Sequence, residues 1–305
     1  MLAGWAALAP ALAAADAAPR KMKIALVPGS IGVTADSQRA LNDLAHRHRF
    51  EAVEPRVEEI AAMSAEQLGE LQADLAAKQL TWAAAGLTVD FRKDETIFRD
   101  GMGKLPELAA GLQRAGVTRV GTWLAPSHGQ LTYRANFRLH TTRLAEIARV
   151  LEAHGLRFGL EYVGTQRSLL GGRYPFVHTM AETRELIAEI GRPNVGLVLD
   201  SWHWWQAGDV AQDVLALKNS DVVSVDLNDA PPGLAKVLHK DGERELPLAT
   251  GVIDLTAFVN ALVAIGYDGP ARPEPFNKAV NALENDPACA ACSEAMHRTM
   301  ALIKS

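Results

Sequence analysis

Short runs rich in apolar and β-branched residues alternate with longer amphipathic stretches along most of the chain. This alternation is typical of parallel strands joined by crossover helices. The candidate strands are 23–28, 50–54, 82–88, 118–124, 157–162, 195–200, 222–227 and 270–274. The candidate helices are 36–48, 64–78, 104–115, 134–154, 180–190, 209–218 and 254–266, with a helical tail from 286.

Eight such units predict an α/β protein with one closed (β/α)8 barrel, a TIM barrel, over residues 21–305. A doubly wound open sheet is the alternative. However, the segment PGSIG at 28–32 is a poor match to the Gly-x-Gly-x-x-Gly expected after the first strand of a dinucleotide-binding sheet. A barrel of about 250 residues is commonly one domain, so the chain length does not require two.

Residues 1–20 are apolar and Ala-rich, lack a basic residue before Arg20, and contain small-residue Ala-x-Ala patterns. We interpret them as an export signal or leader, which predicts a periplasmic or exported protein. The missing positively charged start leaves three alternatives: a misassigned initiator, a cytoplasmic chain with an Ala-rich leader, or a short membrane anchor. No later segment reaches the roughly 18 to 20 apolar residues of a membrane span.

The charge of the chain argues against a nucleic-acid partner. Its formal net charge is -5, and it has no dense run of Lys or Arg that could face a phosphate backbone. With 48% hydrophobic and 22% charged residues, the composition is that of a globular protein with a large core. A small molecule is therefore the expected partner, and a homo-oligomer stays open.

Acidic residues end four consecutive candidate strands. They are Glu161 in GLEYVG, Asp200 in GLVLDSWHWW, Asp226 in SVDLNDAP and Glu274 in RPEPFN. Because the carboxyl ends of barrel strands surround the active site, these four side chains should converge and repel one another unless a cation neutralises them. An oxygen-rich set of this kind favours Mg or Mn. Any single acid could instead form a salt bridge or cap a helix, as Asp200 could before Ser201.

His203 follows Asp200 by three residues and lies among Trp202, Trp204 and Trp205. It is a candidate metal ligand, which would favour Mn, or a candidate substrate contact. The three tryptophans predict an aromatic wall of the kind that stacks on sugar faces. We favour a substrate contact for His203, although a lone histidine is more often structural.

Arg244 is the best candidate for a positive group that contacts a substrate oxygen or carboxylate. The alternative is a surface arginine paired with Glu243 or Glu245. Several residues at or just after the ends of earlier candidate strands could also line the pocket. They are Glu54, Arg92, Lys93, Trp123 and His128.

The segments GLEYVG, GLVLDSWHW, VDLNDAP and GYDGPARPEPF resemble motifs of the xylose isomerase-like superfamily. That superfamily includes tagatose and psicose 3-epimerases, inosose dehydratases, hydroxypyruvate isomerases and, more distantly, endonuclease IV. The resemblance implies one Mn- or Mg-type ion held by Glu, Asp, His and Glu, which correspond here to Glu161, Asp200, position 226 and Glu274. In epimerase-type members the two glutamates also transfer the substrate proton, which assigns catalysis to Glu161 and Glu274.

Asp226 departs from this pattern, because the sugar epimerases have histidine at that position. An aspartate can still bind a hard cation, but its charge changes the Lewis acidity of the ion and the substrate charge that the site would accept. The substrate therefore need not be that of a ketose 3-epimerase.

The chemistry expected from a cation beside two glutamates is abstraction of the proton next to a carbonyl, through an ene-diolate. We therefore expect a metal-dependent isomerase or epimerase for a sugar-like carbonyl compound. Loss of a β-hydroxyl would make the enzyme a dehydratase or lyase instead. A catalytically inactive sugar-binding barrel is a rival from another class. Phosphodiester hydrolysis at a zinc cluster is disfavoured, because few of the nine histidines follow strands.

Cys289 and Cys292 form a lone Cys-x-x-Cys near the C-terminus. Without a second cysteine pair or a thioredoxin-like strand before it, a redox pair or half of a zinc site is disfavoured. A local surface disulfide or two free thiols is expected.

Overall fold

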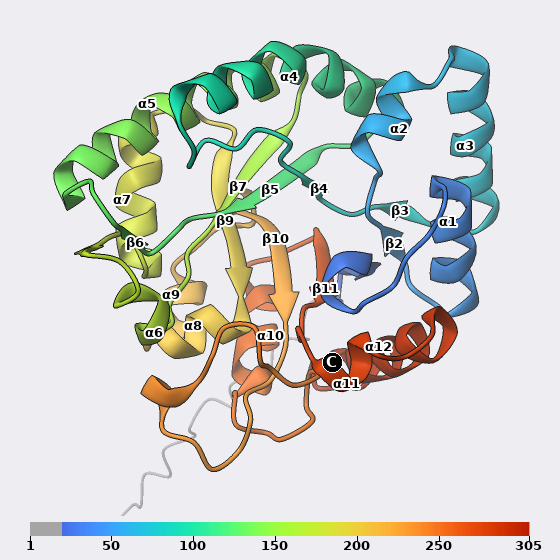
Figure 1. Ribbon diagram of the computed structural model, residues 1–305. Coiled ribbons are helices and arrows are strands. Elements are labelled where there is room, and N and C mark those ends of the chain that lie inside the picture. Colours follow the sequence, from blue (N-terminus) through green and yellow to red (C-terminus); the bar gives the residue numbers. More distant parts are fainter. Residues whose placement is uncertain (1–19, 305) are drawn as a thin grey trace, which may run out of the picture.

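The computed structural model describes residues 20–304, so the predicted leader lies outside the described residues apart from Arg20. Parallel strands form the centre of the molecule and helices surround them (Figure 1). The central strands are β1 (Lys23–Leu26), β2 (Ala52–Val53), β3 (Thr81–Trp82), β4 (Ala85–Gly86), β5 (Arg119–Trp123), β7 (Arg157–Glu161), β9 (Val195–Asp200), β10 (Val222–Leu227) and β11 (Pro270–Pro273).

The sheet has the order β3-β2-β1-β11-β10-β9-β7-β5-β4, and all of its pairs are parallel. Its two ends, β3 and β4, are separated in the chain only by Ala83 and Ala84. The segment 81–86 is therefore one interrupted strand that joins both ends of the sheet. Eight strands result, as the sequence predicts, and the α/β TIM barrel is confirmed.

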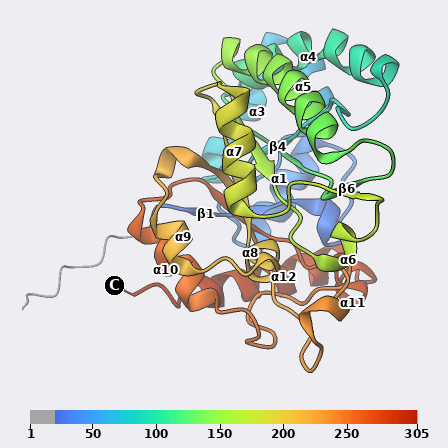
Figure 2. The same cartoon turned by 90° about the vertical axis from the view of Figure 1, so that its left-hand side faces the viewer.

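The predicted helices are also present, with shifted ends. The long helices are α1 (Gln38–Arg47), α3 (Ala65–Ala77), α4 (Glu95–Ala115), α5 (Tyr133–Ala153), α7 (Met180–Ile190), α10 (Leu255–Ala264) and α12 (Asn285–Met300). Shorter helices are α2 (Val57–Ala62), α6 (Gln166–Leu169), α8 (Ser201–Ala207), α9 (Ala211–Leu215) and α11 (Lys278–Asn281). Helices α5 and α7 pack side by side outside the strands (Figure 2). Between residues 20 and 304, no helix combines the length and apolar character that crossing a membrane requires.

Helix α4 begins at Glu95, well before the predicted start at 104. The side chain of Asp94 caps it by accepting a hydrogen bond from the amide of Ile97, and Phe98 is buried within its first turns. Gly101, Gly103 and Pro106 mask this start in the sequence, because glycine and proline usually interrupt helices.

Close packing inside the barrel depends on glycine at 159. A Cβ atom there would lie 2.7 Å from Cγ2 of Val198 and 2.9 Å from Cβ of Val223. Because real Cβ atoms do not approach neighbours this closely, only glycine lets β7 meet the side chains of β9 and β10. Val198 also lines the cavity described below.

Cys289 and Cys292 are buried free thiols on α12, so the predicted surface disulfide is wrong and the free-thiol alternative is confirmed. They lie three residues apart and therefore on one helix face. Helix α12 packs against α1, β1 and α10, which covers that face. Burial raises the pKa of both thiols to about 12.

Candidate active site

The four predicted acids come together at one end of the barrel. Glu161 and Asp200 are the last residues of β7 and β9, Asp226 is near the end of β10, and Glu274 directly follows β11. Each offers a carboxylate oxygen, and these oxygens lie within 4.8 Å of one another. All four side chains are buried. The barrel topology therefore creates a dense group of carboxylates.

Arg272 is the first of two arginines inside this group. Its Nε donates to Oδ1 of Asp226 at 2.6 Å and its Nη2 donates to Oδ2 of the same residue at 2.8 Å. Nη2 also donates to Oε1 of Glu274 at 2.7 Å. The sequence interpretation missed Arg272, although alternation along a strand gives residues two apart the same face and so places Arg272 beside Glu274.

Arg244 is the second arginine, and three carboxylates accept hydrogen bonds from its guanidinium. Its Nη1 donates to Oδ2 of Asp200 at 2.6 Å and to Oε2 of Glu274 at 3.0 Å. Its Nη2 donates to Oδ1 of Asp241 at 2.8 Å. The side chain is 1% exposed, so the alternative of a surface arginine paired with Glu243 or Glu245 is wrong. Backbone hydrogen bonds hold the loop at this end of the barrel, from the Arg244 amide to Pro275 and between Glu245 and Asp229.

Asp200 is held in a fixed orientation. Its Oδ1 accepts hydrogen bonds from the amide of Trp202 at 2.6 Å and from Nδ2 of Asn228 at 2.9 Å. Asp200 is thus the N-cap of α8, as the alternative interpretation allows, and its Oδ2 still faces the acidic group. Burial alone would raise its pKa, but Arg244 and these donors outweigh burial and lower the pKa to about 2.

Glu161 and Glu274 have the opposite electrostatic balance. Burial, with Glu274 and Asp226 nearby, raises the pKa of Glu161 well above its usual range. Burial also raises the pKa of Glu274 to about 8, although Arg272 opposes that shift. Within residues 20–304, Oε1 of Glu161 is buried without a hydrogen-bond partner.

The donor set fits a divalent cation. Two guanidinium groups offset only two of the four carboxylate charges, and a buried carboxylate oxygen without a partner is costly. A doubly charged ion would neutralise the remainder. Arg272 contacts both oxygens of Asp226, and the two arginines together contact both oxygens of Glu274, so Glu161 offers the unpartnered oxygen among the four acids that the structure describes.

His203 lies beside the acids, on helix α8. Its Nδ1 accepts a hydrogen bond from the amide of Gly164 at 3.2 Å, and its Nε2 lies 3.8 Å from carboxylate oxygens of Glu161 and Asp200. These carboxylate oxygens lie beyond hydrogen-bond distance from Nε2, and the Arg244 guanidinium, which only donates, lies closer. Arg244 Nη2 lies 3.2 Å from the same nitrogen.

The predicted aromatic wall is wrong. Trp202 and Trp204 are buried in the hydrophobic core, and Trp204 packs against Phe258 at 5.1 Å between ring centroids. Trp205 packs against His239. The segment forms a helix rather than a loop, so its rings turn toward α10 and the loop after β10.

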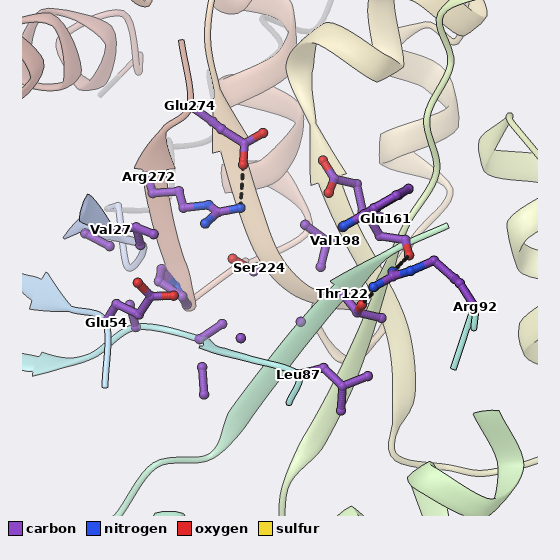
Figure 3. A pocket seen from close by; sticks show the side chains of 18 residues that line it. Val27, Glu54, Leu87, Arg92, Thr122, Glu161, Val198, Ser224, Arg272 and Glu274 are labelled. Atoms are coloured by element: carbon purple, nitrogen blue, oxygen red, sulfur yellow. Dashed lines mark hydrogen bonds and ion pairs between the residues drawn. The ribbon is translucent and has the colours of Figure 1, made fainter. Parts of the chain in front are cut away.

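A cavity of about 240 Å³ opens beside the acids (Figure 3). Its polar and aromatic lining residues are Glu54, Arg92, Thr122, Trp123, Glu161, Ser224, Arg272 and Glu274. Glu54, Arg92 and Trp123 thus lie where the sequence places them, while Lys93 and His128 lie outside the lining. His128 belongs instead to a two-stranded antiparallel pair, β6 (Ser127–His128) with β8 (Tyr174–Pro175), where its Nδ1 accepts from the amides of Gln130 and Leu131.

Comparison with known proteins agrees with this architecture. Over 139 residues the chain is 31% identical to an inosose isomerase of Bacillus subtilis, covering 44% of this chain and 45% of that protein. Over 134 residues it is 30% identical to a 3-dehydroshikimate dehydratase of Pseudomonas aeruginosa, covering 44% of this chain and 20% of that one. The matches thus span less than half the length of these curated relatives.

Solved structures resemble almost the whole chain. A xylose isomerase domain protein of Alicyclobacillus acidocaldarius has a TM-score of 0.80 and 29% identity, and covers 93% of this chain and 100% of that one. An IolI protein with a bound zinc atom has the same fold, with a TM-score of 0.75, 20% identity and coverage of 92% and 98%. The family model described as "Xylose isomerase-like TIM barrel" matches residues 43–294. This chain therefore belongs to the xylose isomerase-like TIM barrel family.

Proposed function

We propose that this protein is a divalent-metal-dependent isomerase or epimerase that moves a proton on a small sugar-like carbonyl compound. The observation that carries the proposal is that Glu161 and Glu274 line one cavity from β7 and from the end of β11, and that burial raises the pKa of both (Figure 3). General acid–base catalysis is most efficient when the pKa of the catalytic group lies near the working pH.

The two glutamates would act on the substrate in turn. One removes the proton next to the carbonyl, and the other returns a proton to the neighbouring carbon or to the opposite face. Arg244 and Arg272 hold the two oxygens of Glu274 from different sides, at 3.0 and 2.7 Å, and so fix its position. Because fixed positions of reacting groups lower the entropic part of the barrier, these arginines support the transfer without touching the reacting carbon.

A cation at this site would be held by Glu161, Asp200 and Glu274, with Asp226 as a fourth candidate. It would supply Lewis-acid polarisation of the substrate's carbonyl and neighbouring hydroxyl. Oxygen ligands favour Mg or Mn. The zinc atom bound in the IolI structure supports a divalent ion in this fold, and the identity of the ion is a separate question that the metal-addition experiment below addresses.

Dehydration is the second candidate reaction, favoured by the similarity to the 3-dehydroshikimate dehydratase. The same proton abstraction leads to dehydration when the substrate has a leaving hydroxyl on the next carbon. Isomerisation and dehydration would use the same residues, so only the identity of the product distinguishes the two reactions.

The test is turnover of a panel of ketoses and keto-cyclitols by the full chain, followed by NMR. The protein is first treated with a chelator and then supplied with Mn or Mg. Glu161→Gln and Glu274→Gln should each lower turnover by about 100-fold or more. Glu185→Gln, an exposed glutamate on α7, is the matched control and should retain parental turnover. Absence of turnover with every cation and substrate would contradict the proposal and favour a sugar-binding barrel.

A further inference from the structure

The cavity contains a cationic group, Arg92, that proton transfer does not use. Its guanidinium lies 4.2 Å from the ring centroid of Trp123 and 4.7 Å from that of Phe91. Its Nη1 donates to the carbonyl of Trp123 at 2.7 Å and to Oγ1 of Thr122 at 3.3 Å. Figure 3 shows Arg92 at the cavity wall beside Thr122. The group is therefore held in place before any ligand arrives.

The charge of Arg92 is only partly balanced by the protein. Its nearest carboxylate is Asp90, with 3.3 Å between Nε and Oδ1, and that side chain is 37% exposed. Arg244 and Arg272 each make shorter contacts with two or more carboxylates. Burial lowers the pKa of Arg92, as expected where water is displaced without a full ionic partner.

Two hydrogen-bond donors remain available at this wall. Among the residues that the structure describes, Nη2 of Arg92 has no hydrogen-bond acceptor, while Nη1 is used twice. The Thr122 hydroxyl accepts from Nη1, so its own proton is free to be donated. Both residues line the cavity. An anion here would receive a charge-assisted bond and a neutral one.

We propose that Arg92 and Thr122 bind a carboxylate of the substrate, so that the substrate is a keto sugar acid or a related acidic carbonyl compound. One guanidinium and one hydroxyl match the single charge and two oxygens of a carboxylate. A phosphate ester carries nearly two charges and three acceptor oxygens, which this wall does not match. The carbonyl part of this substrate rests on the proposed function, whereas its carboxylate is inferred from Arg92 and Thr122 alone.

The strand register places this anion subsite beside the proton-transfer group. Thr122 and Trp123 on β5 are paired with Leu160 and Glu161 on β7. A substrate held at Arg92 by its carboxylate thus extends past Glu161 toward Glu274 on the far side of β9 and β10. The Arg92 guanidinium offsets the repulsion that the nearby Glu161 carboxylate would exert on this acid group.

The test compares three probes by titration calorimetry: a six-carbon keto sugar acid, the neutral ketohexose and a ketohexose phosphate. The parent should bind the acid most tightly, and Arg92→Gln should weaken acid binding by roughly 10- to 100-fold while leaving the neutral sugar nearly unchanged. Thr122→Val, which keeps the guanidinium and side-chain shape, should weaken acid binding by roughly fivefold. Arg99→Gln is the matched control, because Arg99 also lies over a ring, that of Phe98, but outside the cavity.

Solvent-deuterium exchange separates this inference from the proposed function. Arg92→Gln should raise KM for the acid and change kcat little, whereas Glu274→Gln should abolish exchange and retain acid binding. A preference for the neutral or phosphorylated sugar, or an acid preference that survives Arg92→Gln, would overturn the subsite and leave the proton chemistry intact. Arg92-dependent acid binding without exchange would support the subsite and overturn the proposed function. Thermal unfolding of each variant checks that it is folded.

Discussion

Arg272 and Asp226 lie directly opposite each other on β11 and β10 and form a two-bond ion pair of 2.6 and 2.8 Å. The Asp226 side chain is fully buried, and that of Arg272 is 24% exposed. The same guanidinium also donates a hydrogen bond to Oε1 of Glu274. The position that the family resemblance assigns to a metal-binding histidine is thus occupied by an aspartate whose charge the next strand neutralises.

Loss of this ion pair should destabilise the folded protein. Arg272→Gln leaves Asp226 charged, buried and without its main partner, and we expect the free energy of unfolding to fall by about 3 to 5 kcal/mol. The double variant Asp226→Asn with Arg272→Gln should lose less than the sum of the two single losses, because the charge and its partner leave together. Urea unfolding of the four proteins measures this coupling. Simple additivity would show that the pair contributes nothing specific.

The stability of the cation-free protein should fall as pH rises from about 5 toward 8. The pKa of Glu274 is about 8 in the folded protein against 4.5 for an ordinary glutamate, so the folded state binds more protons between these values. Stability therefore decreases with pH across that interval. Asp200, with a lowered pKa of about 2, acts in the opposite direction but only below about pH 4.

Glu274→Gln removes this titrating group and should make the decrease shallower, with the remainder due to Glu161, whose pKa burial also raises. The measurement is urea unfolding from pH 5 to 8 in the presence of a chelator. An equal slope in parent and variant, or a parent that becomes more stable with rising pH, would contradict the assignment.

The two thiols of α12 should be unreactive in the folded protein. Cys289 and Cys292 are 0% exposed, and their raised pKa leaves little thiolate at pH 8. We expect negligible labelling by a thiol reagent at pH 8 until denaturant is added, when both cysteines should react. Rapid labelling of the folded chain would show that the face of α12 opens.

The strand-end acids could be predicted from the sequence because strand alternation fixes the barrel, and the barrel brings strand ends together. Glu161, Asp200, Asp226 and Glu274 needed no knowledge of the loops. Their ion-pair partners were harder to predict. Arg244 lies in an irregular loop held by long-range backbone hydrogen bonds to Pro275 and between Glu245 and Asp229, and the partner of Arg272 depends on the pairing of β10 with β11.

The tryptophans show a different difficulty. Asp-Ser after a strand predicts either a polar loop or a helix cap, and the two alternatives orient the following rings differently. The Asp200 cap directs residues 201–207 into a helix, which buries Trp202 and Trp204 against the core instead of the cavity. Local composition alone does not decide this, because aromatic residues serve sugar stacking and core packing equally well.

The most direct test of the central claim is solvent-deuterium incorporation next to the carbonyl, followed by NMR in D₂O with Mn or Mg present and both neutral and acidic keto sugars as substrates. The account predicts that the parent and Glu185→Gln incorporate deuterium, and that Glu274→Gln does not. Incorporation by Glu274→Gln at the parental rate, or none by the parent with any cation, would contradict proton transfer by the pair Glu161 and Glu274.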